Sequence, residues 1–286
     1  MTRHERIEGA GFHEFPLVLF TALAIAGAGI GTAHLGLRLL GWVPLVPPGW
    51  VMALVGSLLA LGLLLSVGHL GRPFRSAFSL SRVGRSPLSN EVLVLGVALV
   101  TSLGSVTLPP GHSLLAPLSA TALVSSVLTL LALGLVYRLP GQLTWAGPVF
   151  AQPLILGLAF GLTVLQGTLP AGTRARAELL ILVILLADGL LVWERTRRIT
   201  RVLHRGVPSH PRVQGQKGTA LILRIIMGVL LPAGALSAGW SELAGALLFL
   251  NLFLDRTLFY GLAVHSDTEA EVGRVVTALR AGAYDQ

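Results

Sequence analysis

The chain has 286 residues, of which 53% are hydrophobic and only 12% are charged. Soluble globular domains carry about 25% charged residues, so the composition excludes a soluble domain and predicts an integral membrane protein. The formal net charge of +8 comes almost wholly from arginine. Because the basic residues lie in short segments between apolar runs, we expect contacts with membrane lipids or an acidic partner and not with nucleic acid.

Eight apolar runs are long enough, or nearly long enough, to cross a bilayer as helices. In chain order they are residues 15–40, 50–70, 91–109, 114–137, 148–169, 178–193, 219–239 and 242–264. They do not alternate in the manner of barrel strands. The sequence therefore predicts an all-α protein in which residues 1–286 form one transmembrane domain, a bundle of eight transmembrane helices with a very tight turn between the last two.

Eight crossings place both termini on the same side of the membrane, which we call side A; the opposite side is side B. Most lysine and arginine residues outside the runs fall on side A. Side B receives only Arg38, Arg174 and Arg176. By the positive-inside rule, side A faces the cytoplasm.

The densest polar stretch lies between the second and third runs, from His69 to Glu91. Polar groups at a membrane boundary are costly to place, so the stretch is a candidate site. His69 exchanges protons readily at neutral pH, or it simply caps a helix end. Asn90 is a good N-cap, which places Glu91 in the first turn of the third helix. There its carboxylate either stabilises the helix start or accepts a proton beside His69. The arginines of the stretch are candidates for docking a partner or binding lipid phosphates, and Pro73 stops the helix after Arg72.

Further polar residues fall within roughly 15 Å of side A when the eight helices are threaded. They are Tyr137, Asp188, Arg224, Asp255, Arg256 and Tyr260. Their common depth predicts a polar pocket in one leaflet and not a channel through the membrane. Adjacent residues do not share a helix face, so we expect Arg256 to pair with Asp188 or Glu91 instead of Asp255. We interpret the basic run from Arg195 to Arg212 as a topology signal.

Metal centres are not expected in this chain. It has no cysteine, which excludes a cysteine-ligated iron–sulfur cluster and a thiolate metal site. His34 lies toward side B and His69 toward side A, so they cannot ligate one haem from opposite faces. Two pairs of glycines with GxxxG spacing, Gly27 with Gly31 and Gly157 with Gly161, predict close helix contacts.

The stretch from His69 to Glu91 resembles the signature of the membrane-anchor subunit of the dimethyl sulfoxide reductase family. The similar pieces are His69-Leu-Gly-x-Pro-x-Arg75-x-Ala-x-Ser79-Leu, Arg82-x-Gly84, Ser86-x-Leu88-Ser-Asn-Glu91, His13-Glu14-x-Pro16, Tyr137, Trp145 and Arg256-x-x-x-Tyr260. The resemblance implies a multi-pass subunit of a bacterial or archaeal cytoplasmic (inner) membrane that takes part in electron transport in anaerobic respiration. It also implies a molybdopterin catalytic subunit and a four-cluster ferredoxin-like iron–sulfur subunit as partners, and no haem.

Members of this family oxidise menaquinol, and the resemblance maps their quinol-binding histidine and glutamate onto His69 and Glu91. We therefore expect these two residues to accept protons. The expected quinol pocket comprises His69, Arg72, Pro73, Asn90, Glu91, Tyr137, Arg256 and Tyr260. Family partners are often exported, which would place side A outside, whereas the arginine distribution places it inside.

Three other functions remain open at this point. The protein could be a purely structural anchor that holds lipid where quinol would sit, or the quinone-reducing anchor of a related dehydrogenase. A secondary transporter would need broken helices and a site at the middle of the membrane. The gathering of polar residues in one leaflet argues against the transporter.

Overall fold

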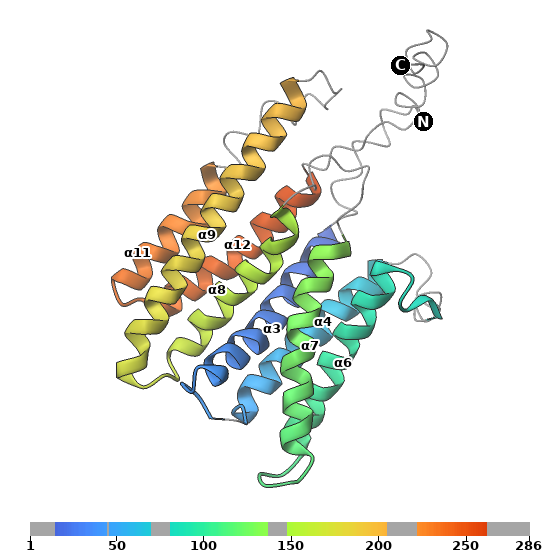
Figure 1. The fold of residues 1–286 in the computed structure, drawn as a ribbon. Coiled ribbons are helices and arrows are strands. Elements are labelled where there is room, and N and C mark those ends of the chain that lie inside the picture. The colour runs from blue at the N-terminus through green and yellow to red at the C-terminus, as the bar shows by residue number, and fades with distance from the viewer. Residues whose placement is uncertain (1–14, 45, 70–80, 137–147, 205–221, 262–286) are drawn as a thin grey trace, which may run out of the picture.

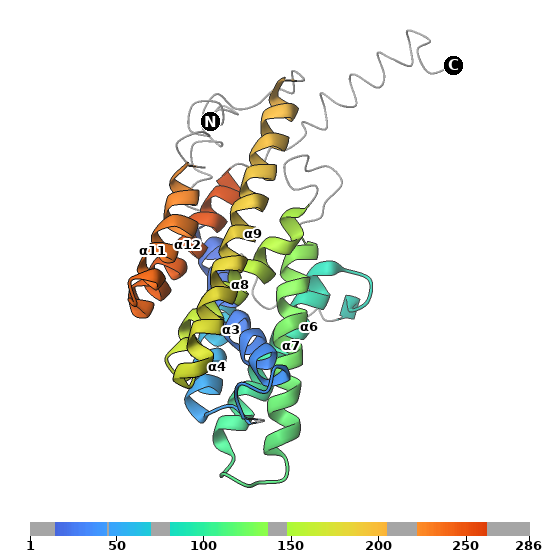
Figure 2. The ribbon, with the colours of Figure 1, turned by 60° about the vertical axis from the view of Figure 1, so that its left-hand side comes forward.

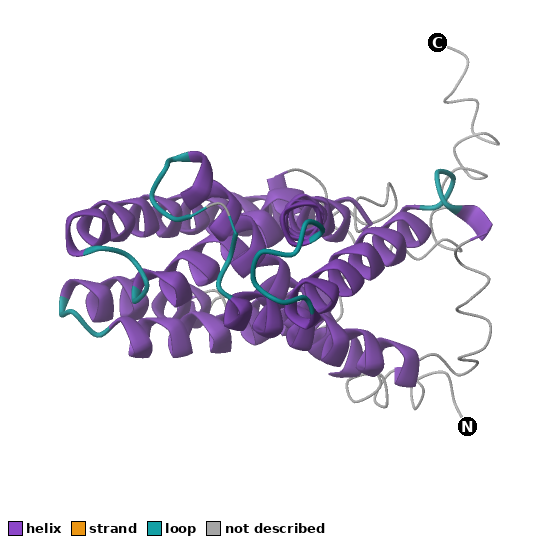
Figure 3. Ribbon diagram, turned by 90° about the horizontal axis from the view of Figure 1, so that it is seen from below, coloured by secondary structure: helices purple, strands orange, loops and turns teal. Residues whose placement is uncertain are grey.

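The computed structural model describes residues 15–44, 46–69, 81–136, 148–204 and 222–261, and every regular element in these ranges is a helix (Figures 1 and 3). The elements in chain order are α3 (Phe15–Leu39), α4 (Gly49–His69), α6 (Pro87–Thr107), α7 (Leu115–Val136), η2 (Pro148–Ala151), α8 (Gln152–Gln166), α9 (Ala171–His204), η3 (Ile226–Leu230), α11 (Leu231–Ser237) and α12 (Ser241–Gly261). The predicted all-α class is confirmed.

Four of these helices, α3, α4, α6 and α7, are long and apolar enough to cross a membrane, as a multi-pass membrane protein requires. The apolar helices at Gln152–Gln166 and Ile222–Ser237 are shorter. Helices α9 and α12 are long, but each contains buried charged residues. The eight crossings and the common side of the termini therefore stay predictions.

The helices form two groups on either side of α3. Helices α4, α6 and α7 lie on one side of it, and α8, α9, α11 and α12 lie on the other (Figures 1 and 2). The short connections 40–48, 108–114, 167–170 and 238–240 gather at the end that corresponds to side B. The helix ends next to the segments that are not described gather at the other end, side A.

Helix α3 is the centre of the bundle, buried almost continuously from Val18 to His34. It packs against α4, α7, α8 and α12. Three of its glycines face three different neighbours: a Cβ at Gly27 would press on Leu59 of α4, one at Gly29 would overlap the carbonyl of Gly157 in α8, and one at Gly31 would overlap the hydroxyl of Ser126 in α7.

Helices α3 and α8 cross closely because both have glycine at the point of contact. A Cβ on Gly161 would overlap the backbone of Gly29, just as one on Gly29 would overlap Gly157. Small residues let helix backbones approach closely enough for extensive van der Waals contact in lipid. The predicted close contact at Gly157 and Gly161 is confirmed, although its partner on α3 is Gly29, midway between Gly27 and Gly31.

Helix α9 is much longer than the sixth predicted span, residues 178–193, because the charged residues at both ends continue the helix. Arginine and glutamate are good helix formers, so polarity alone does not end a helix. Two stripes at helical spacing run along it. The exposed stripe is Leu179, Val183, Leu186, Leu190 and Trp193, and the buried stripe is Ala177, Ile181, Leu185, Asp188, Val192 and Arg195.

The helix from residue 222 to Ser237 contains one π turn, η3, and ends in a tight stop. The Leu231 N–H donates to the carbonyl of Ile226, five residues back. Pro232 follows and has no N–H, which removes the usual α-helical donor for the carbonyl of Gly228. At the other end Gly239 takes a φ of 79°, and the Trp240 N–H donates to Ala235 O at 2.8 Å, so the predicted tight turn before α12 is confirmed.

Candidate functional site

The most polar part of the described interior is a buried group of side chains between α8, α9, α12 and the helical residues 222–225. We call it the ionic cluster; it consists of Gln152, Asp188, Arg195, Arg224, Asn251, Asp255 and Arg256. None of these residues is more than 4% exposed. The expectation that Asp188, Arg224, Asp255 and Arg256 gather is confirmed.

Asp255 of α12 is the hub of the ionic cluster. Its Oδ1 accepts hydrogen bonds from Arg224 Nε at 3.2 Å and Gln152 Nε2 at 3.4 Å, and lies 3.9 Å from Arg195 Nη1. Its Oδ2 accepts from Nε of Arg256 at 3.0 Å and also from Nη2 of that residue. One carboxylate thus connects all four helical segments that form the cluster.

Asp188 of α9 is held by one partner. Arg224 Nη2 donates to both of its carboxylate oxygens, at 2.8 and 3.1 Å. Arg224 therefore bridges the two aspartates, since its Nε is bound to Asp255. Paired and hydrogen-bonded charges are the form in which ions persist in a protein interior.

Local helix geometry explains why these side chains meet. Asp188 and Arg195 are seven residues apart, which places both on the buried stripe of α9. Asn251 and Asp255 are four residues apart on α12 and share its inner face. Arg224 stands one helical turn before Gly228 of the π turn, and a Cβ on Gly228 would overlap its Nη1 atom.

Three members of the cluster were not predicted from the sequence. Arg195 was assigned to a topology signal, yet its spacing of seven residues from Asp188 marks one helix face. Asn251 carries a similar signal, four residues before Asp255. Gln152 has no local signal, because only the packing of α8 on α12 brings it to Asp255.

The predicted partner of Arg256 was wrong. Its guanidinium pairs with the adjacent Asp255 and lies 4.8 Å from the ring centroid of Phe259, which also contacts Arg195 at 5.5 Å. The side chain of arginine is long enough to reach back around the helix to a neighbouring residue. Asp188 is taken by Arg224 instead.

Glu91 lies elsewhere, on α6, and is only 2% exposed. The helix begins at Pro87, four residues earlier than the predicted span 91–109, so Glu91 is about 6 Å inside the helix rather than at its first turn. Proline suits a first helical position, which accounts for the earlier start. Within the described part of the chain, no hydrogen bond or ion pair to its carboxylate is found.

The sequence predicted Asn90 as the N-cap of α6, but Asn90 does not cap this helix. The N-cap is Ser86, and Asn90 Oδ1 accepts a hydrogen bond from the Gly84 N–H at 2.7 Å. Gly84 has a φ of 80°, a conformation that glycine adopts at little cost. Asn90 therefore fixes the turn that leads into the helix.

The remaining residues of the expected quinol pocket lie outside what the structure describes. Arg72, Pro73 and Tyr137 fall in segments that are not described, and for His69 and Tyr260 only the helical backbone is described. Glu91 and Arg256 stand on helices on opposite sides of α3 (Figure 1). The structure does not bring these two together, and the shared pocket stays a prediction.

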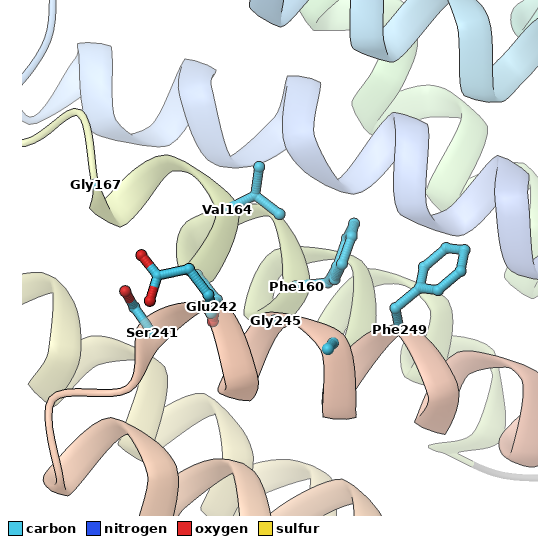
Figure 4. A pocket seen from close by; sticks show the side chains of 9 residues that line it. Phe160, Val164, Gly167, Ser241, Glu242, Gly245 and Phe249 are labelled. Atoms are coloured by element: carbon cyan, nitrogen blue, oxygen red, sulfur yellow. The ribbon is translucent and has the colours of Figure 1, made fainter.

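A separate cavity of about 430 Å³ lies toward side B between α8 and α12. Phe160 and Phe249, whose ring centroids are 5.7 Å apart, line it together with Thr163, Ser241 and Glu242 (Figure 4). The cavity is mostly apolar and lies at the end opposite to His69 and Glu91. Its position therefore does not match the quinol pocket expected from the sequence.

Comparison with known proteins finds a family similar to residues 8–146. The sequence profile of the DMSO reductase anchor subunit (DmsC) matches residues 8–146. The anaerobic dimethyl sulfoxide reductase protein YnfH of Escherichia coli (strain K12) is 38% identical over 92 residues, and the C subunit of anaerobic dimethyl sulfoxide reductase from the same organism is 41% identical over 88 residues. The corresponding C subunit of Haemophilus influenzae is 38% identical over 84 residues.

Each of these alignments covers 29% of this chain and 30% of the relative. The profile match contains the whole stretch from His69 to Glu91 on which the resemblance was based, whereas six of the seven members of the ionic cluster lie on α9, on α12 or between them. The resemblance predicted from the sequence is confirmed: residues 8–146 match the DMSO reductase anchor subunit family.

Proposed function

We propose that this protein is the membrane anchor of a molybdopterin oxidoreductase complex in a bacterial or archaeal cytoplasmic membrane. It binds and oxidises menaquinol, with His69 and Glu91 as proton acceptors. The electrons pass to a four-cluster ferredoxin-like iron–sulfur subunit and on to the molybdopterin catalytic subunit in anaerobic respiration. The observation that carries this proposal is the family match over residues 8–146, which includes both residues.

The environment of Glu91 supports the proposal. A carboxyl group that is 2% exposed and has no hydrogen-bond partner among the described residues is free to take up a proton from a bound hydroxyl group. Helix α4, which ends at His69, packs against α6, which carries Glu91 about 6 Å from its start. Both residues therefore belong to the side-A ends of neighbouring helices.

The chemistry of quinol oxidation requires a partner. Each menaquinol releases two protons and two electrons. His69 and Glu91 provide acceptors for the protons, but the protein has no cysteine and so cannot ligate an iron–sulfur cluster through thiolates. In this proposal the electrons leave for a cluster in the docked subunit, and the arginine-rich segments of side A supply the docking surface.

The test compares Glu91→Gln and His69→Ala with Glu242→Gln in the assembled complex. Glu242 is a matched control because it is exposed and lies at the opposite end of the bundle. We expect both site variants to lose menaquinol-driven turnover while a soluble donor that reduces the iron–sulfur subunit directly still supports full activity. Unchanged quinol-driven turnover in an assembled complex would leave a purely structural anchor that binds lipid.

Quinone reduction by a related dehydrogenase is the alternative direction of electron flow. In that case the wild-type complex shows no quinol-driven reduction. The same two variants then lower the quinone-dependent oxidation of the partner's substrate. A secondary transporter is a further alternative, and solute flux by the isolated protein in proteoliposomes would favour it.

A further inference from the structure

The ionic cluster contains more positive than negative charge. Three guanidinium groups, those of Arg195, Arg224 and Arg256, face two carboxylates, those of Asp188 and Asp255. All five side chains are at most 5% exposed. The formal surplus of one positive charge is therefore buried, and a buried uncompensated charge is strongly unfavourable.

Several polar atoms of the cluster have no hydrogen-bond partner among the described residues. The unpaired donors are Arg195 Nε, Arg224 Nη1 and Asn251 Nδ2, and the unpaired acceptors are Asn251 Oδ1 and Gln152 Oε1. Each unsatisfied buried group costs about 1–3 kcal/mol, and charged groups cost more. The interior thus has both the charge and the donors for a ligand that the described part of the chain does not supply.

The unpaired donors lie at two places in the cluster. Arg224 Nη1 and the Asn251 amide both crowd over Gly228, where a Cβ would overlap them. Among the described residues, Arg195 is the least paired cation of the cluster, because its ion pair to Asp255 is 3.9 Å long.

We propose that the ionic cluster binds one small, singly charged anion, which neutralises the surplus charge of the cluster and accepts hydrogen bonds from Arg224 Nη1 and the Asn251 amide nitrogen. A cation would increase the surplus, and a neutral ligand would leave it in place. A free halide and a phosphate oxygen of an anionic lipid headgroup share the required chemistry. The proposal is independent of the quinol site, because Glu91 stands on the other side of α3.

The direct test is binding of radioactive chloride to the full-length protein, purified in a neutral detergent with gluconate as the replacement anion. We expect saturable binding of about one chloride per protein molecule and a Tm that rises with chloride, since a ligand of the folded state stabilises it. Arg195→Gln removes the surplus charge and is expected to weaken binding about tenfold or more. Arg197→Gln is the matched control on the exposed face of α9 and should bind as the wild type does.

Two further arms complete the test. Nanodiscs of phosphatidylglycerol and of phosphatidylcholine separate the two sources: an Arg195-dependent rise in Tm with phosphatidylglycerol alone assigns the site to a lipid headgroup. If Arg195→Gln does not fold, Asn251→Leu replaces it, because it removes two of the unpaired atoms without changing the charge. Absence of saturable chloride binding together with absence of a lipid effect overturns the proposal, as does wild-type binding by a folded Arg195→Gln or Asn251→Leu protein.

Discussion

Arg224 donates two hydrogen bonds from one nitrogen to the carboxylate of Asp188, at 2.8 and 3.1 Å, across two separate helices. Both side chains are almost completely buried. The contact joins α9 to the helix that begins at residue 222 and, through Asp255, to α12. This buried salt bridge therefore holds together the group of helices that contains α8, α9, α11 and α12.

Breaking the salt bridge between Arg224 and Asp188 is expected to destabilise the protein strongly. Asp188→Asn leaves the guanidinium of Arg224 with one carboxylate instead of two, and removal of one partner of a buried pair costs about 3–5 kcal/mol. We expect a clear fall in Tm measured in detergent, with Glu242→Gln as the exposed control. The double variant Asp188→Leu with Arg224→Met should recover much of the loss, and equal Tm values for Asp188→Asn and the wild type would contradict the role of the pair.

The contact of α3 with α8 predicts a difference between two glycines of one helix. Gly29→Ala places a methyl group against the backbone of Gly157, which forces the helices apart at a cost of about 1–3 kcal/mol. Gly36→Ala meets open space and is expected to be neutral or slightly stabilising, because alanine has the higher helix propensity. Thermal unfolding of both variants measures the difference, and similar Tm values would argue against the close crossing.

Gly228 in the π turn and Gly234 in α11 form a second pair of glycines that should respond differently to substitution by alanine. A methyl group at this position displaces Arg224 Nη1 and the Asn251 amide, so Gly228→Ala should weaken the pairing of Arg224 with both aspartates. Gly234→Ala in α11, where no atom lies within 4 Å, is the matched control. We expect a lower Tm for the first variant only. A Gly228→Ala protein as stable as the control would show that the cluster accommodates the methyl group.

The absence of cysteine makes the predicted topology directly measurable, because each introduced thiol is the only one in the protein. If α9 crosses the membrane, Ala175→Cys and Arg197→Cys react with an impermeant maleimide from opposite sides. By the arginine distribution we expect Ala175→Cys to be labelled in intact spheroplasts and Arg197→Cys only in inverted vesicles. Labelling of both from one side would exclude a crossing by α9.

Sequence patterns predicted the all-helical class correctly because the apolar runs are long and their polar interruptions rare, whereas the eight crossings stay a prediction. They predicted the gathering of Asp188, Arg224 and Asp255 from depth alone. They could not predict which arginine meets which aspartate, because Arg224 depends on the register of a π turn and Gln152 on the packing of α8. The bounds of α9 were underestimated for a related reason, since hydropathy marks the part of a helix in lipid and not the whole helix.

The start of α6 shows how one residue changes the interpretation of a site. Asn90 before Glu91 resembles a helix cap, but Pro87 begins the helix one turn earlier and makes Glu91 an interior residue. Glu91 therefore does not serve merely to stabilise the first turn of α6 through its negative charge. Burial without a described partner is what distinguishes it from a surface glutamate.

The glycine-lined helix α3 also has a consequence for biosynthesis. It precedes every other described helix in the sequence, yet its neighbours α8 and α12 are synthesised much later. Until they arrive, two of its faces must remain in contact with lipid, which its largely apolar surface permits. Of the described helices, the one at the centre of the bundle is thus synthesised first and enclosed last, and a truncated protein that stops before α12 would leave it open on one side.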